Sequence, residues 1–190
     1  MCFTSAQLEA VKGHGVQVYA MHLLRNRPEW ERLFFVWAGS GSQRQRIAGE
    51  LDRLRLADKV RFLGQVWNID EMMDAADIFI QTSVYEGMGR VFPEAMAKGL
   101  PIIATRVGGI PEAVGEHAVL LSPPSDVEAT ARQLADAIVA WIRDEAARKK
   151  FGATARKNRA MNFFEPRIVE KYMRIIEGVI DGVDKPPTTT

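Results

Sequence analysis

Short hydrophobic runs alternate along the chain with segments of helical periodicity. The runs cover Met1–Thr4, Leu33–Ala38, Val60–Leu63, Ile78–Gln81, Pro101–Ala104 and Ala118–Leu121. Because they are apolar at consecutive positions rather than at every second one, they are typical of strands with helices packed on both faces. The pattern predicts an α/β fold, a Rossmann-like parallel sheet of about five or six strands with helices on both faces.

Helical patterns occupy segments between the strands and the whole last third of the chain. Apolar side chains recur three and four residues apart in Gln43–Leu56 and again in Glu128–Arg143. Further helices are predicted over Glu145–Asn162 and Arg167–Ile180, so a C-terminal helical tail follows the sheet. We expect one domain over residues 1–182, and we predict that the Pro- and Thr-containing residues 183–190 are disordered.

The last predicted helix has a wide apolar surface. Ile168, Tyr172, Ile176 and Val179 fall on one stripe, and further apolar residues lie beside it. This surface is wider than one contact on a small domain requires. We expect it to pack on a second domain, and to cause self-association where it is left exposed.

Composition and charge exclude several classes of partner. The formal net charge of +1 gives no field that would attract nucleic acid or an anionic membrane. No apolar run approaches the roughly 18 residues that cross a bilayer, and the N-terminus lacks a signal-peptide pattern. Cys2 is the sole cysteine, so no disulfide can form within the chain, and we predict a cytoplasmic protein. The three histidines lack the spacing of metal ligands, and no metal is expected.

The candidate chemistry lies in Tyr85–Pro111, which reads YEGMGRVFPEAMAKGLPIIATRVGGIP. Gly87 and Gly89 follow a predicted strand and precede a helix predicted to start near Arg90–Pro93. Ligands of open α/β sheets lie beyond the carboxyl ends of the strands. A glycine-bearing loop and helix start at that place can direct several N–H groups toward a phosphate.

Two glutamates flank this loop, Glu86 and Glu94, with seven residues between them. A carboxylate at the position of Glu94 can accept two hydrogen bonds from a vicinal diol such as that of ribose. Glu86 is placed to bind hydroxyls of a sugar on the other side of a diphosphate. A lone glutamate is more often a solvated loop or cap residue, but the pairing inside a strand–loop–helix unit favours a binding site.

This segment resembles the signature of the group 1 retaining glycosyltransferases, a family with the two-domain GT-B fold. The signature is a glutamate, seven residues, a second glutamate, an AMAxGxP motif and a Gly-Gly pair. It matches at Glu86, Glu94, Ala95, Met96, Ala97, Gly99, Pro101, Gly108 and Gly109, and upstream at Lys12-Gly13, Gly39-Ser40-Gly41, Val60–Val66 and Ala76-Asp77. The resemblance covers nearly the whole chain, in the order of the C-terminal, donor-binding domain.

The resemblance implies a role for each matched residue. Glu94 would bind ribose hydroxyls, and Glu86 would contact the donor sugar. The donor-binding loop would comprise Gly87, Met88, Gly89, Arg90 and Val91, with backbone amides around Met88–Val91 holding the distal phosphate. Lys12 would neutralise the diphosphate as the leaving group develops charge, and the backbone near Gln65 and Val66 would contact the base. Family members act without a metal, so the nucleoside diphosphate sugar is expected as substrate and no cofactor is expected.

One position departs from the family pattern. The family has an arginine five residues before the lysine, where this chain has Gln7. A neutral amide can donate hydrogen bonds to a phosphate but supplies no charge. Either another cation such as Arg90 or Arg106 substitutes in part, or the diphosphate is bound more weakly.

The implied activity is transfer of a sugar from a nucleoside diphosphate sugar to an acceptor, with Glu86 and Lys12 as the catalytic residues. The family binds the acceptor, including any acceptor at a membrane surface, with a separate N-terminal domain. This chain starts at the first strand of the donor domain. We therefore expect the isolated chain to bind donor but to transfer almost no sugar. The alternative is a stand-alone nucleotide-sugar-binding module without catalytic activity.

Two other enzyme classes fit the sequence less well. The segment GSGSQR lacks the third glycine of a dinucleotide fingerprint, and no acidic residue follows at a suitable strand end, which disfavours a dehydrogenase. A sugar-nucleotide epimerase of similar fold would show carboxylate and histidine constellations that we do not find. His14 is interpreted as the start of a helix rather than a base. Trp37, Trp67 and Trp141 are expected in the core or in pocket walls rather than as stacking platforms.

Overall fold

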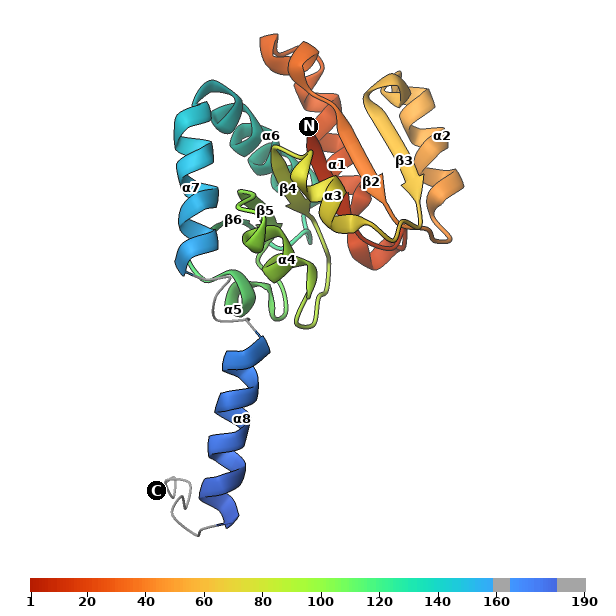
Figure 1. Cartoon of the computed structure of the whole chain (residues 1–190). Helices are drawn as coiled ribbons and strands as arrows, with labels where there is room; N and C mark the ends of the chain where they lie inside the picture. Colours follow the sequence, from red (N-terminus) through yellow and green to blue (C-terminus); the bar gives the residue numbers. More distant parts are fainter. Residues whose placement is uncertain (159–164, 181–190) are drawn as a thin grey trace.

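A computed structural model describes residues 1–158 and 165–180 (Figure 1). Six strands form one sheet in the order β3-β2-β1-β4-β5-β6. They are β1 (Cys2–Ser5), β2 (Phe35–Ala38), β3 (Val60–Gly64), β4 (Ile78–Gln81), β5 (Ile102–Thr105) and β6 (Ala118–Leu121). Every neighbouring pair is parallel. The predicted Rossmann-like parallel sheet is therefore confirmed.

Helices cover both faces of this sheet. The helices are α1 (His14–Leu24), α2 (Arg44–Leu54), α3 (Ile69–Asp74), α4 (Val91–Ala97), α5 (Ile110–Val114), α6 (Val127–Arg143), α7 (Glu145–Asn158) and α8 (Glu165–Ile180), with short 3-10 helices η1 (Ala10–Lys12), η2 (Pro28–Arg32) and η3 (Ala57–Lys59). The helices predicted over Gln43–Leu56 and Glu128–Arg143 correspond to α2 and α6. Residues 159–164 and 181–190, which include the predicted tail, lie outside the described part of the chain.

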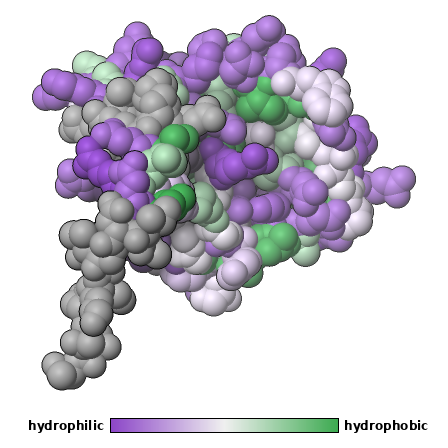
Figure 2. Space-filling view, turned by 60° about the horizontal axis from the view of Figure 1, so that its bottom comes forward, coloured by the Kyte–Doolittle hydropathy of each residue, from purple (hydrophilic) through white to green (hydrophobic). Residues whose placement is uncertain are grey.

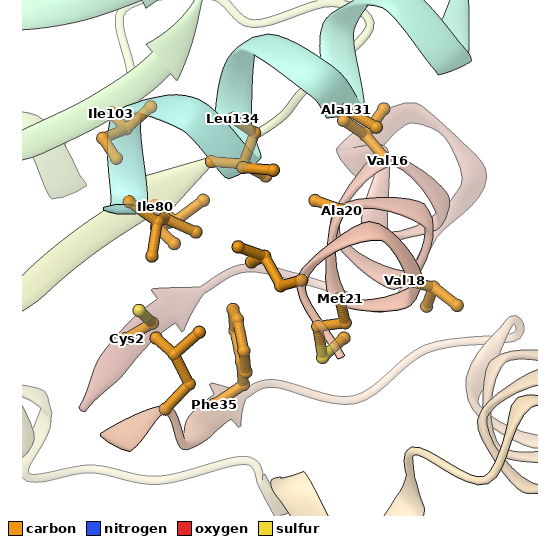
Figure 3. Close-up of a cluster of buried hydrophobic side chains, with 14 of the residues drawn as sticks. Cys2, Val16, Val18, Ala20, Met21, Phe35, Ile80, Ile103, Ala131 and Leu134 are labelled. Carbon is orange, nitrogen blue, oxygen red and sulfur yellow. The ribbon is translucent and has the colours of Figure 1, made fainter. Parts of the chain in front are cut away.

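Two hydrophobic cores result from the alternation of side chains along each strand. Phe35 and Trp37 of β2 belong to one core, whereas Val36 and Ala38 belong to the other. Figure 3 shows the first core, where side chains of α1 and α6 face those of β1, β2, β4 and β5. The second core lies beneath α3, α4 and α5. Because successive side chains of a strand point to opposite faces, a strand covered on both faces is apolar at consecutive positions, as β2 is.

Helix α1 is buried on most of its surface, since it packs against both α2 and α6. Its buried side chains include Val16, Val18, Ala20 and Met21. A helix that is buried on several sides has no continuous polar face, so its sequence shows only a weak alternation of polar and apolar residues at helical spacing. This explains why the sequence marks only its start, at His14, where the structure confirms it.

Helix α8 projects from the rest of the chain (Figure 1). The side chains of Val169, Tyr172, Met173 and Ile176 are exposed. Its predicted apolar stripe is thus exposed at Tyr172 and Ile176, while the side chains of Ile168 and Val179 lie outside the described set. No helix within residues 1–158 or 165–180 is long and apolar enough to cross a membrane.

The order of the strands defines where a ligand would lie. From β1 the sheet extends through β2 and β3 on one side and through β4, β5 and β6 on the other. The connections therefore reverse direction between β1 and β4, and ligands of open α/β sheets bind at such a switch point, beyond the carboxyl ends of the strands. The loops that follow β1 and β4 start at this point.

Candidate donor-binding site

The loops after β1 and β4 meet at the switch point. Lys12 ends η1 in the first loop, and Glu86 lies in the second. The backbone N–H of Val84 donates a hydrogen bond of 2.8 Å to the carbonyl of Val11, which joins the two loops beside these residues. The strand order therefore brings together two residues that are 74 positions apart in the chain.

Lys12 and Glu86 form an ion pair. The Nζ atom of Lys12 lies 2.8 Å from Oε2 of Glu86, and the two side chains are 20% and 13% exposed. The hydroxyl of Ser83 donates to the same carboxylate oxygen at 3.1 Å. Partial burial reduces the screening of this pair by water. The structure thus holds the two predicted catalytic residues in contact at the switch point.

Hydrogen bonds among buried polar side chains hold the loops after β1 and β4 in place. The amide of Gln17 donates to Thr82 Oγ1 at 3.2 Å, and Thr82 in turn donates to the carbonyl of Gly13 at 3.0 Å. The indole of Trp37 donates to Gln17 Oε1 at 2.9 Å, so the amide is satisfied from both sides. Neither Gln17 nor Thr82 is part of the motifs that predict the site. A signal was present, because the polar run Gln81-Thr82-Ser83 interrupts an apolar strand at its carboxyl end.

The Gly108-Gly109 turn contacts the backbone of the loop that carries Glu86. The N–H of Gly109 donates to the carbonyl of Glu86 at 3.1 Å. Gly108 has φ of +50°, and a Cβ atom at this position would lie 1.9 Å from the same carbonyl oxygen. Only glycine permits this approach. The Gly-Gly pair of the signature thus forms a turn that contacts the candidate site.

Four successive backbone N–H groups in the glycine loop are free. Within the described residues, those of Met88, Gly89, Arg90 and Val91 have no hydrogen-bond partner. Helix α4 starts at Val91, as predicted, but it has only seven residues, and the N–H of Phe92 already donates to Gly89. The anion-binding capacity therefore lies in the loop amides rather than in the length of the helix.

Glu94 lies in the first turn of α4 and does not join the Lys12–Glu86 pair. It faces a cleft of about 480 Å³, which is lined by Trp67, Ile69, Asp70, Met73, Glu94, Ala97 and Lys98. Partial desolvation raises the pKa of the Glu94 carboxyl above its ordinary value, and the neighbouring charge of Arg90 opposes this rise. The same cleft is lined by Trp67, Ile69 and Asp70, which follow β3 in the chain.

A second cleft, of about 290 Å³, lies at the ends of β1, β2 and β3 and includes Gln7 and Val66. Ile69 lines both clefts. Ser40, from the GSG segment, accepts a hydrogen bond of 2.9 Å from the N–H of Leu8. A Cβ atom at Gly39 would lie 2.0 Å from the carbonyl oxygen of Ala6, and one at Gly41 would lie 2.5 Å from that of Leu8. The close packing of this segment on the loop that carries Gln7 therefore accounts for its glycines without a dinucleotide.

Figure 2 views the molecule from the edge where the strands end. Hydrophilic residues gather in the middle of this face, and separate hydrophobic patches surround them. Arg90 and Arg106, the two cations considered as substitutes for an arginine at position 7, are both exposed. No group of three or more His, Cys, Asp or Glu side chains within the described ranges could hold a metal ion.

His14 is buried rather than exposed to this site. It is 3% exposed, and its ring contacts Trp37 edge-on with centroids 5.1 Å apart. Burial, aided by the charge of Lys12, lowers the pKa of His14 to about 4. The imidazole is therefore neutral at pH 7, and the interpretation of His14 as the start of a helix is confirmed.

Residues 1–158 match the family described as Glycosyl transferases group 1, and the chain belongs to this family. The match includes every predicted site residue. Of the described chain, only helix α8 lies beyond it. The chain is therefore a glycosyltransferase domain by family and by fold.

Individual relatives agree with this assignment. The chain is 33% identical over 144 residues to N-acetyl-alpha-D-glucosaminyl L-malate synthase of Bacillus anthracis, covering 75% of this chain and 36% of that protein. Anabaena HepE, solved with UDP-glucose, superimposes with a TM-score of 0.78 at 26% identity, covering 95% of this chain and 48% of that one. Sucrose-phosphate synthase from Thermosynechococcus elongatus superimposes with a TM-score of 0.75 at 28% identity, covering 96% of this chain and 46% of that one. The chain thus spans between a third and a half of these relatives.

Proposed function

We propose that this chain is the donor-binding, C-terminal half of a retaining glycosyltransferase that transfers a sugar from a nucleoside diphosphate sugar to an acceptor. The observation that carries the proposal is the Lys12–Glu86 pair at the switch point, beside four free N–H groups. An ammonium and several aimed N–H groups complement a diphosphate. The structures of relatives with UDP-glucose support a nucleotide-sugar ligand.

Different residues of the site would bind different parts of the donor. Lys12 and the amides of Met88–Val91 would hold the diphosphate, and Lys12 would stabilise the charge that develops on the leaving phosphate. Glu86, released from Lys12, would accept hydrogen bonds from hydroxyls of the donor sugar. Glu94 would bind the ribose. In this proposal the charge of the diphosphate is neutralised by protein groups, and no metal is required.

The acceptor would be bound by a second domain, since the chain spans less than half of the relatives described above. The exposed apolar side chains of α8 offer that domain a contact surface. A stand-alone binding module without catalysis is the second candidate. The exposed, uncharged Gln7 favours it, because it leaves the diphosphate with fewer cations.

Replacing Glu94 with alanine should weaken binding of UDP-glucose by about 1.5–3 kcal/mol, because two charge-assisted hydrogen bonds to ribose are lost. Binding by the wild-type chain should also weaken as the pH is lowered. Since the pKa of Glu94 is raised, this loss should begin at a higher pH than for an ordinary glutamate. Titration calorimetry over a pH series measures both effects. UDP-glucose is a suitable ligand because its phosphate diesters do not titrate in this range.

Glu94→Gln should retain part of the affinity and lose the pH dependence. Glu50→Gln on α2, another partly exposed glutamate, serves as the control and should bind like the wild type. Equal affinities of the wild type and Glu94→Ala would remove Glu94 from the ribose site. No binding of UDP-, GDP- or ADP-sugars by the wild type would contradict the proposed function itself.

A charge series at the diphosphate tests the other end of the donor. Lys12→Ala should weaken UDP binding about 10- to 150-fold, because a charge-assisted contact is lost and Glu86 is left as an unpaired negative charge beside the ligand. Gln7→Arg should tighten it, since it adds a cation to the loop after β1 that also carries Lys12. Lys149→Ala, which removes an exposed lysine of α7, is the matched control. Unchanged binding in Lys12→Ala would place the diphosphate elsewhere, and no gain in Gln7→Arg would mean that another residue already supplies that charge.

A further inference from the structure

Trp67 differs from the other tryptophans of the chain. Trp37 is fully buried, Trp141 is 9% exposed and packs against Phe151, and Lys59 lies over the ring of Trp30. Trp67, in contrast, is 91% exposed. Within the described residues its ring has no aromatic or cationic partner and its indole N–H has no acceptor. Tryptophan is a residue that proteins usually bury for most of its surface.

The position of Trp67 places this exposed ring beside the proposed ribose site. Trp67 directly follows Val66, in the loop between β3 and α3, and it lines the same cleft of about 480 Å³ as Glu94. Ile69, Met73 and Ala97 supply apolar side chains to that cleft. The amide of the neighbouring Asn68 donates a hydrogen bond of 2.6 Å to the carboxylate of Glu71 in the first turn of α3.

A nucleoside has one group that Glu94 can bind and one that Trp67 can bind. Its diol and its base are attached to the same ribose, so a ligand whose diol binds Glu94 carries its base only one glycosidic bond away. The base needs an apolar surface with a flat face, and an indole offers one. Aromatic stacking tolerates any base, because every base has a π face.

We propose that Trp67 is a binding residue that stacks on the nucleobase of the donor, so that its exposed ring becomes covered when the nucleotide binds. The sequence-based expectation of a pocket wall for Trp67 agrees with its place in the cleft, but its exposure assigns it the stacking role that was disfavoured there. This inference rests on the proposed function, since it takes the position of the ribose from Glu94.

Calorimetry with UDP, UDP-glucose and inorganic pyrophosphate tests the proposal on the full chain. Trp67→Ala should weaken binding of UDP and of UDP-glucose equally, by about 5- to 100-fold. Binding of pyrophosphate, which has no base, should be unchanged. Trp67→Phe keeps an aromatic face and should retain most of the affinity, whereas Trp67→Leu should lose nearly as much as alanine. Because the side chain is exposed, none of these changes disturbs the core.

Fluorescence provides an independent measurement. UDP should quench the emission of the wild-type chain, and Trp67→Phe should abolish most of this quenching while it still binds UDP. Val127→Ala, another exposed apolar side chain, is the control and should behave like the wild type.

Several results would overturn the proposal. Wild-type UDP affinity in Trp67→Ala would do so, as would full rescue by leucine, which would indicate a simple apolar cover. A loss seen with UDP-glucose but not with UDP would place the ring against the sugar instead. If the wild type binds pyrophosphate but no nucleotide, both the proposed function and this inference are wrong. If nucleotides bind and substitutions of Trp67 do not change their affinity, only this inference is wrong.

Discussion

The chain alone should bind a nucleoside diphosphate sugar and yet transfer its sugar at least about 10⁵-fold more slowly than the same chain joined to an acceptor-binding domain. Holding two reactants in attack geometry contributes on the order of 7–11 kcal/mol in favourable cases. Under the proposed function, this chain holds only the donor. A site without its second wall also stays open to water, which weakens the electrostatic contacts of Lys12 and Glu86.

Radiolabelled sugar nucleotides and a panel of acceptors measure this difference. The chain by itself is compared with a hybrid in which the acceptor domain of a group 1 relative precedes Met1. The hybrid carrying Lys12→Ala is the matched control, and it should lose transfer while it retains the fold. Robust transfer by the chain alone would overturn the half-enzyme proposal, because a second copy or another surface of this chain would then hold the acceptor.

Replacing Gly108 with alanine should destabilise the protein by about 3 kcal/mol and strongly weaken nucleotide binding. The added Cβ would lie 1.9 Å from the carbonyl oxygen of Glu86, so backbone must move, and φ of +50° is strained for alanine. The movement displaces the loop that holds Glu86 and the free amides after it. Urea unfolding gives the stability, and calorimetry with UDP gives the binding.

Gly49→Ala is the matched control for this prediction. Gly49 lies in the middle of α2, and a Cβ there meets no atom within 4 Å. Alanine should therefore stabilise the protein by up to about 1 kcal/mol through helix propensity. Equal stability and UDP affinity in Gly108→Ala and the wild type would mean that the glycine turn does not constrain the Glu86 loop.

Much of the architecture could be predicted from local pattern. The continuous apolar runs predicted all six strands to within two residues at each end, because a strand buried on both faces favours apolar side chains at consecutive positions. The short helices α3 and α5 were not predicted. They have six and five residues, too few for a helical period to stand out from the flanking loops.

The sequence named the residues of the candidate site but did not give their geometry. The glutamate spacing and the glycine loop identified Glu86 and Glu94, and the family resemblance added Lys12. Nothing in the local sequence indicates that Lys12 contacts Glu86, since that contact depends on β1 and β4 being neighbours at the switch point. The supporting roles of Gln17 and Thr82 follow from the same adjacency.

The sequence by itself therefore determined the class of fold, the family and the residue types available to bind a donor. The tertiary structure alone decided which of those residues meet, and which side chains remain exposed. Trp37 and Trp67 illustrate the difference, since the first is buried beneath the site and the second is open to solvent on the cleft wall. Periodicity reports only neighbours within a few residues, whereas contacts and exposure depend on the order in which the strands assemble.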